Sequence, residues 1–100
     1  MNRGLPPLGR VSAFTERALR RLAGPARLWR ARSLVESVSD LYEDEFSICA
    51  TVEDGEQHQA MLHHAFGPLS AECDCTDGRN EPCCAHAAAV GLYYLTDDPR

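Results

Sequence analysis

The sequence contains no lysine, so all ten of its basic residues are arginine. No stretch approaches the ~20 consecutive apolar residues of a membrane-spanning helix, and no glycine-rich phosphate-binding loop is present. Residues 1–24 have no apolar core of the kind found in a secretory signal. These absences argue against a membrane protein and a nucleotide-binding enzyme, and we expect an intracellular protein.

The chain of 100 residues has the length of one domain. A domain this short buries only about 60–65% of the surface that its unfolded chain exposes, so its hydrophobic core is limited. A covalent or metal staple would therefore contribute much of its stability.

Charge is distributed unevenly along the chain. Residues 1–32 carry eight arginines and one acid, Glu16, whereas residues 33–100 carry two arginines and fourteen acids. The net charges of these two parts are +7 and −12, which gives −5 for the whole chain. We therefore predict a basic amino-terminal arm, residues 1–32, followed by an acidic domain, residues 33–100.

The basic arm is expected to contain one helix, with Ser12 as its N-cap and a stop at Gly24-Pro25. Arginine suits phosphate, so the arm could contact nucleic acid, an acidic protein partner or the acidic domain of the chain itself. Leu28 and Trp29 are expected to pack in the core, with an exposed anchor for a partner as the alternative. The candidate partner contacts are Arg17, Arg20, Arg21, Arg27, Trp29 and Arg30.

The acidic domain shows the alternating apolar pattern of strands. Strands are predicted at residues 34–42 and 46–53, with an acidic turn at 43–45, and a further strand at 69–72 precedes a helix from about Ala85. Together with the arm, this order predicts an α+β fold. The fold would contain an N-terminal helix, a small antiparallel meander of three to four strands and a C-terminal helix stapled by zinc.

The hairpin after the second strand has two alternative loops. A two-residue loop at Asp54-Gly55 would oppose two like charges and split the apolar face. A three-residue loop that adds Glu53 instead pairs Ile48 with Ala60 and keeps the apolar face intact. We predict the three-residue loop.

Residues 72–90 read ECDCTDGRNEPCCAHAAAV and hold four of the five cysteines. Disulfides are disfavoured, because thiols stay reduced inside cells and the cysteine count is odd. On an extended segment Cys73 and Cys75 project to the same side. The second cysteine pair lies at a helix N-terminus, which favours thiolates. Three sulfurs with one imidazole complete a tetrahedral site, and such soft ligands favour zinc over magnesium or calcium.

The identity of the third sulfur ligand stays open at this point. Cys83 and His86 are three apart and share a face if both lie inside the helix. Cys84 and His86 are two apart, about 200° around a helix, and converge only if Cys84 precedes the first helical turn. The spacing alone slightly favours Cys83. Cys49 lies far from the cluster in sequence and is expected to be inert packing.

Cys73-Asp-Cys75 followed by Cys84-Ala-His86 and an alanine-rich helix resembles the SWIM zinc finger, whose pattern is C-x-C…C-x-H. The resemblance extends over the predicted strands and covers about residues 31–96. It implies that residues 33–100 form a SWIM-type zinc-binding domain with Cys73, Cys75, Cys84 and His86 as ligands and Cys83 as a neighbour. It also implies binding to DNA or to other proteins.

A zinc ion held by four protein ligands has no open position for water or substrate, so its role would be structural. We therefore expect neither an enzyme nor a small-molecule substrate. Zinc with three thiolates adds a net charge of about −1 to a domain that is already acidic, which repels phosphate. A protein-interaction or scaffolding module is favoured, and a DNA-binding module that uses the arginine-rich arm is the alternative.

Overall fold

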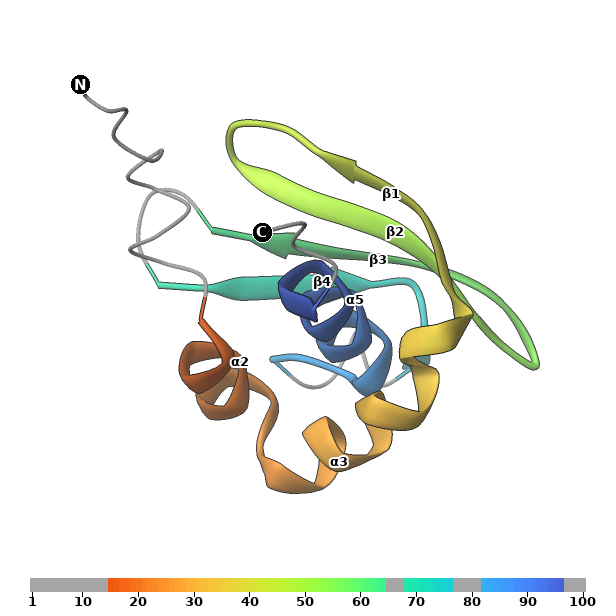
Figure 1. The fold of residues 1–100 in the computed structure, drawn as a ribbon, viewed down its shortest axis with the longest axis horizontal. Coiled ribbons are helices and arrows are strands. Elements are labelled where there is room, and N and C mark those ends of the chain that lie inside the picture. The colour runs from red at the N-terminus through yellow and green to blue at the C-terminus, as the bar shows by residue number, and fades with distance from the viewer. Residues whose placement is uncertain (1–14, 65–67, 77–81, 97–100) are drawn as a thin grey trace.

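The structure is a computed structural model that describes residues 15–64, 68–76 and 82–96. It confirms the α+β fold: within these residues, four strands form one antiparallel sheet in chain order, and three α-helices lie on the same face of that sheet (Figure 1). The elements are α2 (Glu16–Ala23), α3 (Pro25–Leu34), the 3₁₀ turn η1 (Val35–Ser37), β1 (Val38–Glu43), β2 (Ser47–Asp54), β3 (Glu56–His63), β4 (Ser70–Cys73) and α5 (Ala85–Thr96).

Helix α2 begins at Glu16, because Thr15 acts as its N-cap. The hydroxyl oxygen of Thr15 accepts a hydrogen bond from the backbone N–H of Ala18 at 3.0 Å, which satisfies one of the free donors of the first turn. The predicted N-cap, Ser12, lies outside the described residues. The predicted stop is confirmed, since Gly24 ends the helix with φ +87°.

Helix α3 follows immediately and was not predicted. Pro25 occupies its first turn, where proline fixes a helical φ and lacks only a hydrogen bond that would be unmade anyway. Leu28, Ala31 and Leu34 recur at a spacing of three and are all buried. The strand predicted from residue 34 is therefore wrong for its first four residues, and β1 begins at Val38.

The hairpin of β2 and β3 has a different register from the prediction. Ile48 pairs with Leu62 instead of Ala60, and the single residue Gly55, at φ +81°, separates the last paired residues of the two strands. The predicted pairing and loop are thus wrong by two residues. Because side chains alternate with a period of two, this shift leaves the paired side chains of β2 and β3 on their predicted faces.

Phe46 also departs from the prediction, since it is exposed and lies just before β2. The Asp44 carboxylate accepts hydrogen bonds of 2.8 Å from the backbone N–H groups of both Phe46 and Ser47. This contact closes the predicted acidic turn and holds Phe46 in it, away from the apolar face.

Helix α5 is the centre of the core. Its residues 85–92 are all buried, because the sheet packs on one side of it and α2 and α3 on the other (Figure 1). A Cβ atom added to Gly91 would lie 2.8 Å from a methyl carbon of Leu19 and 3.0 Å from one of Leu62. The absence of a side chain at Gly91 therefore lets α5 pass between α2 and β3. Among the described residues, no helix has the length and apolarity needed to cross a bilayer.

Candidate metal centre

The first cysteine pair lies where β4 ends. Cys73 is the last residue of β4, and Asp74 starts the turn that leads to Cys75. The backbone N–H of Asp74 donates to the carbonyl of Gln59 at 3.3 Å, and its carboxylate accepts from the Gln59 N–H at 3.3 Å. The same carboxylate lies 3.2 Å from Nδ1 of His58. These contacts with β3 fix the turn between the two sulfurs.

The second pair lies at the N-terminus of α5. The Cys84 carbonyl accepts the hydrogen bond of the Ala88 N–H at 3.1 Å, and the Cys84 sulfur accepts one from the Ala87 N–H at 3.4 Å. Cys84 thus occupies the N-cap position, and His86 lies in the first turn. Since Cys84 precedes that turn, its side chain and that of His86 converge instead of diverging around the helix.

Four ligand atoms come together between β4 and α5. One atom from each of Cys73, Cys75, Cys84 and His86 lies within 4.8 Å of all the others. Nδ1 of His86 is 3.8 Å from the sulfur of Cys73 and 3.8 Å from that of Cys84. A tetrahedral zinc site places sulfur and nitrogen ligands about 3.5 Å apart. The four residues are therefore close enough to hold a metal ion.

Cys83, the rival ligand, lies outside this group. Its side chain is only 2% exposed, and its thiol donates to the Cys84 carbonyl at 3.5 Å. Burial, followed by the charge of Cys84, raises the pKa of the Cys83 thiol to about 12. The geometry brings Cys84 to His86, whereas the spacing alone favoured Cys83. Cys49 lies half-buried on β2, and all five cysteines are free thiols.

The two closest thiols affect each other's ionisation. A hydrogen bond from Cys73, aided by the backbone N–H of Ala87, lowers the pKa of Cys84 to about 5. The same contact with Cys84, together with burial, raises the pKa of Cys73 well above its usual range. Neighbouring thiolates cannot all ionise without a compensating cation. A bound divalent ion would supply such a charge.

The other side of the His86 ring is held by residues that the sequence did not indicate. Nε2 of His86 lies 2.9 Å from Oδ2 of Asp54, and the same oxygen accepts a hydrogen bond from Arg30 at 2.7 Å. The contacts with His86 and then Arg30 outweigh burial and lower the pKa of the Asp54 carboxyl. The ring of His58 stacks on that of His86, with centroids 4.2 Å apart. The sequence predicts that His58, like His63 and His64, is an ordinary strand residue, with one of the three as a candidate outer partner of the ligands.

The candidate partner residues lie on α2 and α3. Trp29 is 76% exposed, so the expectation that it packs in the core is wrong, whereas Leu28 is buried as expected. Glu16 pairs with Arg20 at 3.4 Å and with Arg32 at 3.1 Å. Arg30 also pairs with Asp54. These ion pairs neutralise part of the positive charge of the basic arm with acids of the same chain.

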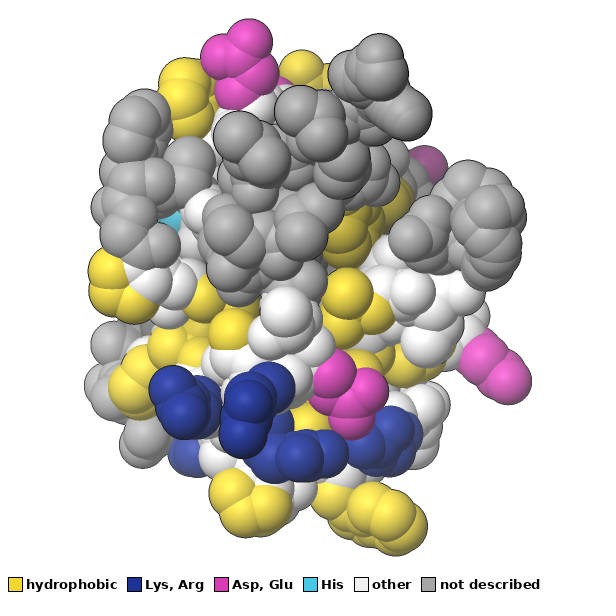
Figure 2. Space-filling model, turned by 60° about the vertical axis from the view of Figure 1, so that its left-hand side comes forward, with side chains coloured by type: hydrophobic (Ala, Val, Ile, Leu, Met, Phe, Trp, Pro, Cys, Tyr) yellow, Lys and Arg dark blue, Asp and Glu magenta, His cyan; other side chains and the backbone are white. Residues whose placement is uncertain are grey.

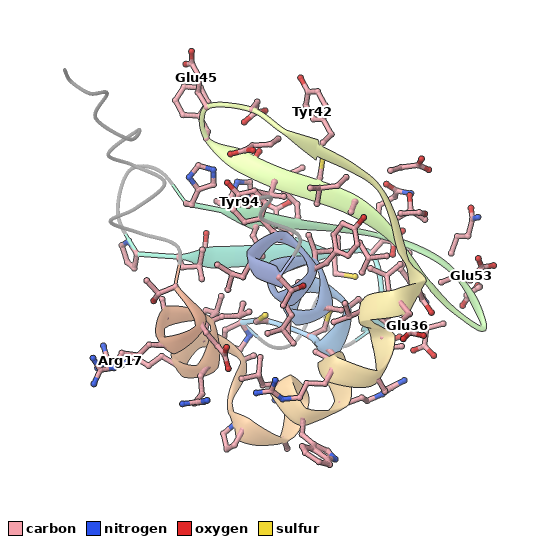
Figure 3. All side chains as sticks on the ribbon, viewed as in Figure 1. Arg17, Glu36, Tyr42, Glu45, Glu53 and Tyr94 are labelled. Carbon is pink, nitrogen blue, oxygen red and sulfur yellow. The ribbon has the colours of Figure 1, made fainter. Side chains whose placement is uncertain are left out.

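All described arginines belong to these two helices, and Figure 2 shows their side chains as a band across one face, with an acid among them. Arg17 projects outward from α2, whereas Glu45 and Glu53 lie at the turns of the sheet, far from it (Figure 3). Among the described residues, the arginines therefore stay together on one face of the folded chain, although Arg30 pairs with Asp54 of the acidic domain.

Comparison with protein-family models, with curated proteins and with solved structures finds no match. What this centre can do is therefore indicated by its donor atoms, their burial and their spacing.

Proposed function

We propose that the chain is a SWIM-type zinc-binding module in which Cys73, Cys75, Cys84 and His86 hold one structural Zn²⁺. The observation that carries the proposal is the set of four ligand atoms, three sulfurs and one imidazole nitrogen, within 4.8 Å of one another. Soft donors of this kind suit zinc, and four protein donors leave no position for a reacting water. When bound, the ion supplies the positive charge that lets the thiolates be buried together.

The proposed ion would connect two elements that are distant along the chain. Cys73 ends β4 and Cys84 caps α5, so their joint ligation ties the edge of the sheet to the central helix. Structural zinc sites in small modules bind with about 10–16 kcal/mol, as large as the ~5–15 kcal/mol stability of a typical domain. We therefore expect the carboxy-terminal half to lose its fold without the metal.

Metal content and its effect on the fold test this proposal directly. Native mass spectrometry of the reduced protein should show one zinc ion per chain, and removal with a strong chelator should abolish most of the far-ultraviolet circular dichroism. Readdition of zinc should restore it. A purified, reduced protein that is metal-free and fully folded would refute the proposal.

For its cellular role we propose a protein-interaction or scaffolding module that binds an acidic partner through α2 and α3. Trp29 is 76% exposed on this face, and Arg17 and Arg21 have no acidic partner among the described residues. Tryptophan and arginine are the residues that most often dominate the energy of a protein interface. The positive charge of the arginines on this face is opposite to that of an acidic partner, which raises the rate of association.

The same band of arginines favours DNA binding as a second candidate, since arginine pairs well with phosphate. Titration of labelled duplex and single-stranded DNA at two salt concentrations distinguishes the DNA-binding candidate from the protein-interaction candidate. Deleting residues 1–32 is unsuitable, because Leu19 and Ala31 belong to the core. Arg17→Gln with Arg21→Gln is the better variant.

Affinity that falls steeply with salt and is lost in that double variant would establish the DNA-binding candidate. Absence of binding at low salt favours the protein partner. Trp29→Ala is the matched variant for the protein interface, because it removes an exposed side chain that is not one of the four proposed ligands, so zinc binding should stay unchanged.

A further inference from the structure

We infer that Asp54 is a positioning residue for the metal centre: it holds the His86 ring so that Nδ1 faces the three sulfurs, and Arg30 holds Asp54. The inference rests on the proposed zinc site and deepens it. It concerns a residue that is 32 positions away from His86 and that comes from the hairpin of β2 and β3.

The contact with Asp54 selects one of the two nitrogens of His86 as the ligand. A neutral imidazole carries a proton on one nitrogen and a lone pair on the other. Nε2 lies 2.9 Å from the Asp54 carboxylate, which can only accept, so Nε2 carries the proton and donates it. The lone pair is then on Nδ1, which lies 3.8 Å from the sulfurs of both Cys73 and Cys84. A carboxylate in this place also makes the ligating nitrogen more basic.

Asp54 is itself fixed from two sides. It is the last residue of β2, next to Gly55 with its φ of +81°. Its Oδ2 atom, the one that faces His86, also accepts a 2.7 Å hydrogen bond from Arg30 on α3. The Asp54 side chain is 29% exposed, less than that of Arg30 at 53%. An exposed ion pair contributes little to stability, so the restraint on the carboxylate is its main effect here.

The His86 ring is also confined on its face. His58 stacks on it with an interplanar angle of 21°, and Nδ1 of His58 lies 3.2 Å from Asp74 in the turn between the two cysteines. The ring is thus held at one edge by Asp54 and on one face by His58. Rotation of the ring away from the sulfurs would break both contacts, so the imidazole is preorganised for metal binding.

The decisive measurement is zinc affinity, by competition with a chromophoric chelator. Asp54→Ala should raise the Kd about 10–100-fold, the loss typical of such outer partners. Asp54→Asn should raise it less, because its amide oxygen can still accept from Nε2. Glu53→Gln is the matched control: it removes one negative charge from the adjacent, exposed position of the same hairpin and should bind zinc as the wild type does.

A second readout separates positioning from a merely stabilising contact. In the zinc-loaded wild type, ¹⁵N spectra of the His86 ring should show a metal-bound Nδ1 and a protonated Nε2. Arg30→Gln should weaken zinc binding in the wild-type background but have no further effect in Asp54→Ala, because Arg30 acts through Asp54. If Asp54→Ala is poorly folded, the zinc affinity of Asp54→Asn and the ¹⁵N spectra still test the inference.

Equal zinc affinity in Asp54→Ala, Asp54→Asn and the wild type would overturn the inference and leave the zinc site intact. Ligation through Nε2 of His86 in the ¹⁵N spectra would also overturn it. A wild type without affinity for zinc would overturn both this inference and the proposed function.

Discussion

The sulfur of Cys84 accepts a hydrogen bond from the backbone N–H of Ala87 across 3.4 Å, in the place where an N-cap side chain is normally found. The positive end of the α5 dipole therefore faces this sulfur, which favours its thiolate form. The same sulfur lies 3.8 Å from Nδ1 of His86. One residue is thus placed to cap the central helix and to ligate a metal ion.

Replacement of Cys84 by serine separates these two roles. Serine can replace the capping acceptor but not the sulfur ligand, so Cys84→Ser should reduce zinc to substoichiometric levels and, with the zinc, the folded content of the carboxy-terminal half. Cys83→Ser should retain one zinc ion per chain, because the Cys83 thiol bonds to the backbone carbonyl of Cys84 and does not belong to the four-ligand group. Native mass spectrometry of both variants decides the ligand, and loss of zinc in Cys83→Ser alone would reverse the assignment.

Leu62 is the side chain of β3 whose truncation should be most costly. It is fully buried, pairs with Ile48 and faces Gly91 of α5. Leu62→Ala removes apolar contacts and leaves a cavity, so it should lower the free energy of unfolding by about 2–5 kcal/mol. Urea denaturation in excess zinc measures this loss. Met61→Ala, on the opposite face of the same strand and only half-buried, is the control and should lose clearly less.

The Asp44 carboxylate should make stability depend on pH. Hydrogen bonds from the backbone N–H groups of Phe46 and Ser47 lower its pKa below the ordinary 3.8. Its contribution is therefore fully present above pH 3.8 and lost as pH falls through the lower folded value.

Comparison with Asp44→Asn isolates this effect, because acid removes zinc from both proteins alike. The difference in melting temperature between the wild type and Asp44→Asn should be largest near neutral pH and shrink in acid. A difference that stays constant from neutral pH into acid would contradict the role of the charge.

Gly91 should tolerate no branched side chain. Its added Cβ would meet the methyl groups of Leu19 and Leu62, both of which are fully buried, so these side chains would have to shift inside the core. Gly91→Val should therefore lower the free energy of unfolding by about 1–3 kcal/mol through overpacking. Gly91→Ala should cost less, because the higher helix preference of alanine offsets about 1 kcal/mol. Thermal unfolding of both variants would show the order, and a Gly91→Val protein as stable as the wild type would contradict it.

Local chemistry made much of the fold predictable. The alternation of residues 46–53 identified a strand with an apolar face, and the alanine-rich run after Cys84 identified the central helix. These patterns depend on side-chain periods of 2 and 3.6, which are properties of single elements. Helix α3 was missed because Pro25 was interpreted only as the end of a helix, although proline is also favourable in a first turn.

The register of the hairpin could not be predicted from such patterns. Pairings that differ by two residues bury the same side chains, so apolar alternation cannot separate them. In the folded chain Asp54 stays at the end of β2, where it contacts Arg30 and His86. Both contacts join residues more than 20 positions apart, so no local pattern contains them.

The sequence by itself determined which donors were available, three sulfurs and one imidazole in two short pairs, because residue type and spacing define the chemistry of a ligand set. The spacing left Cys83 and Cys84 open, and the tertiary structure brings Cys84 to His86, as the resemblance had implied, because the convergence depends on the residue at which α5 begins. The tertiary structure also decided the contacts of Asp54 and the exposure of Trp29. Both depend on how the helices pack against the sheet. That packing brings together residues that are distant along the chain, so the local sequence around a residue does not predict these contacts.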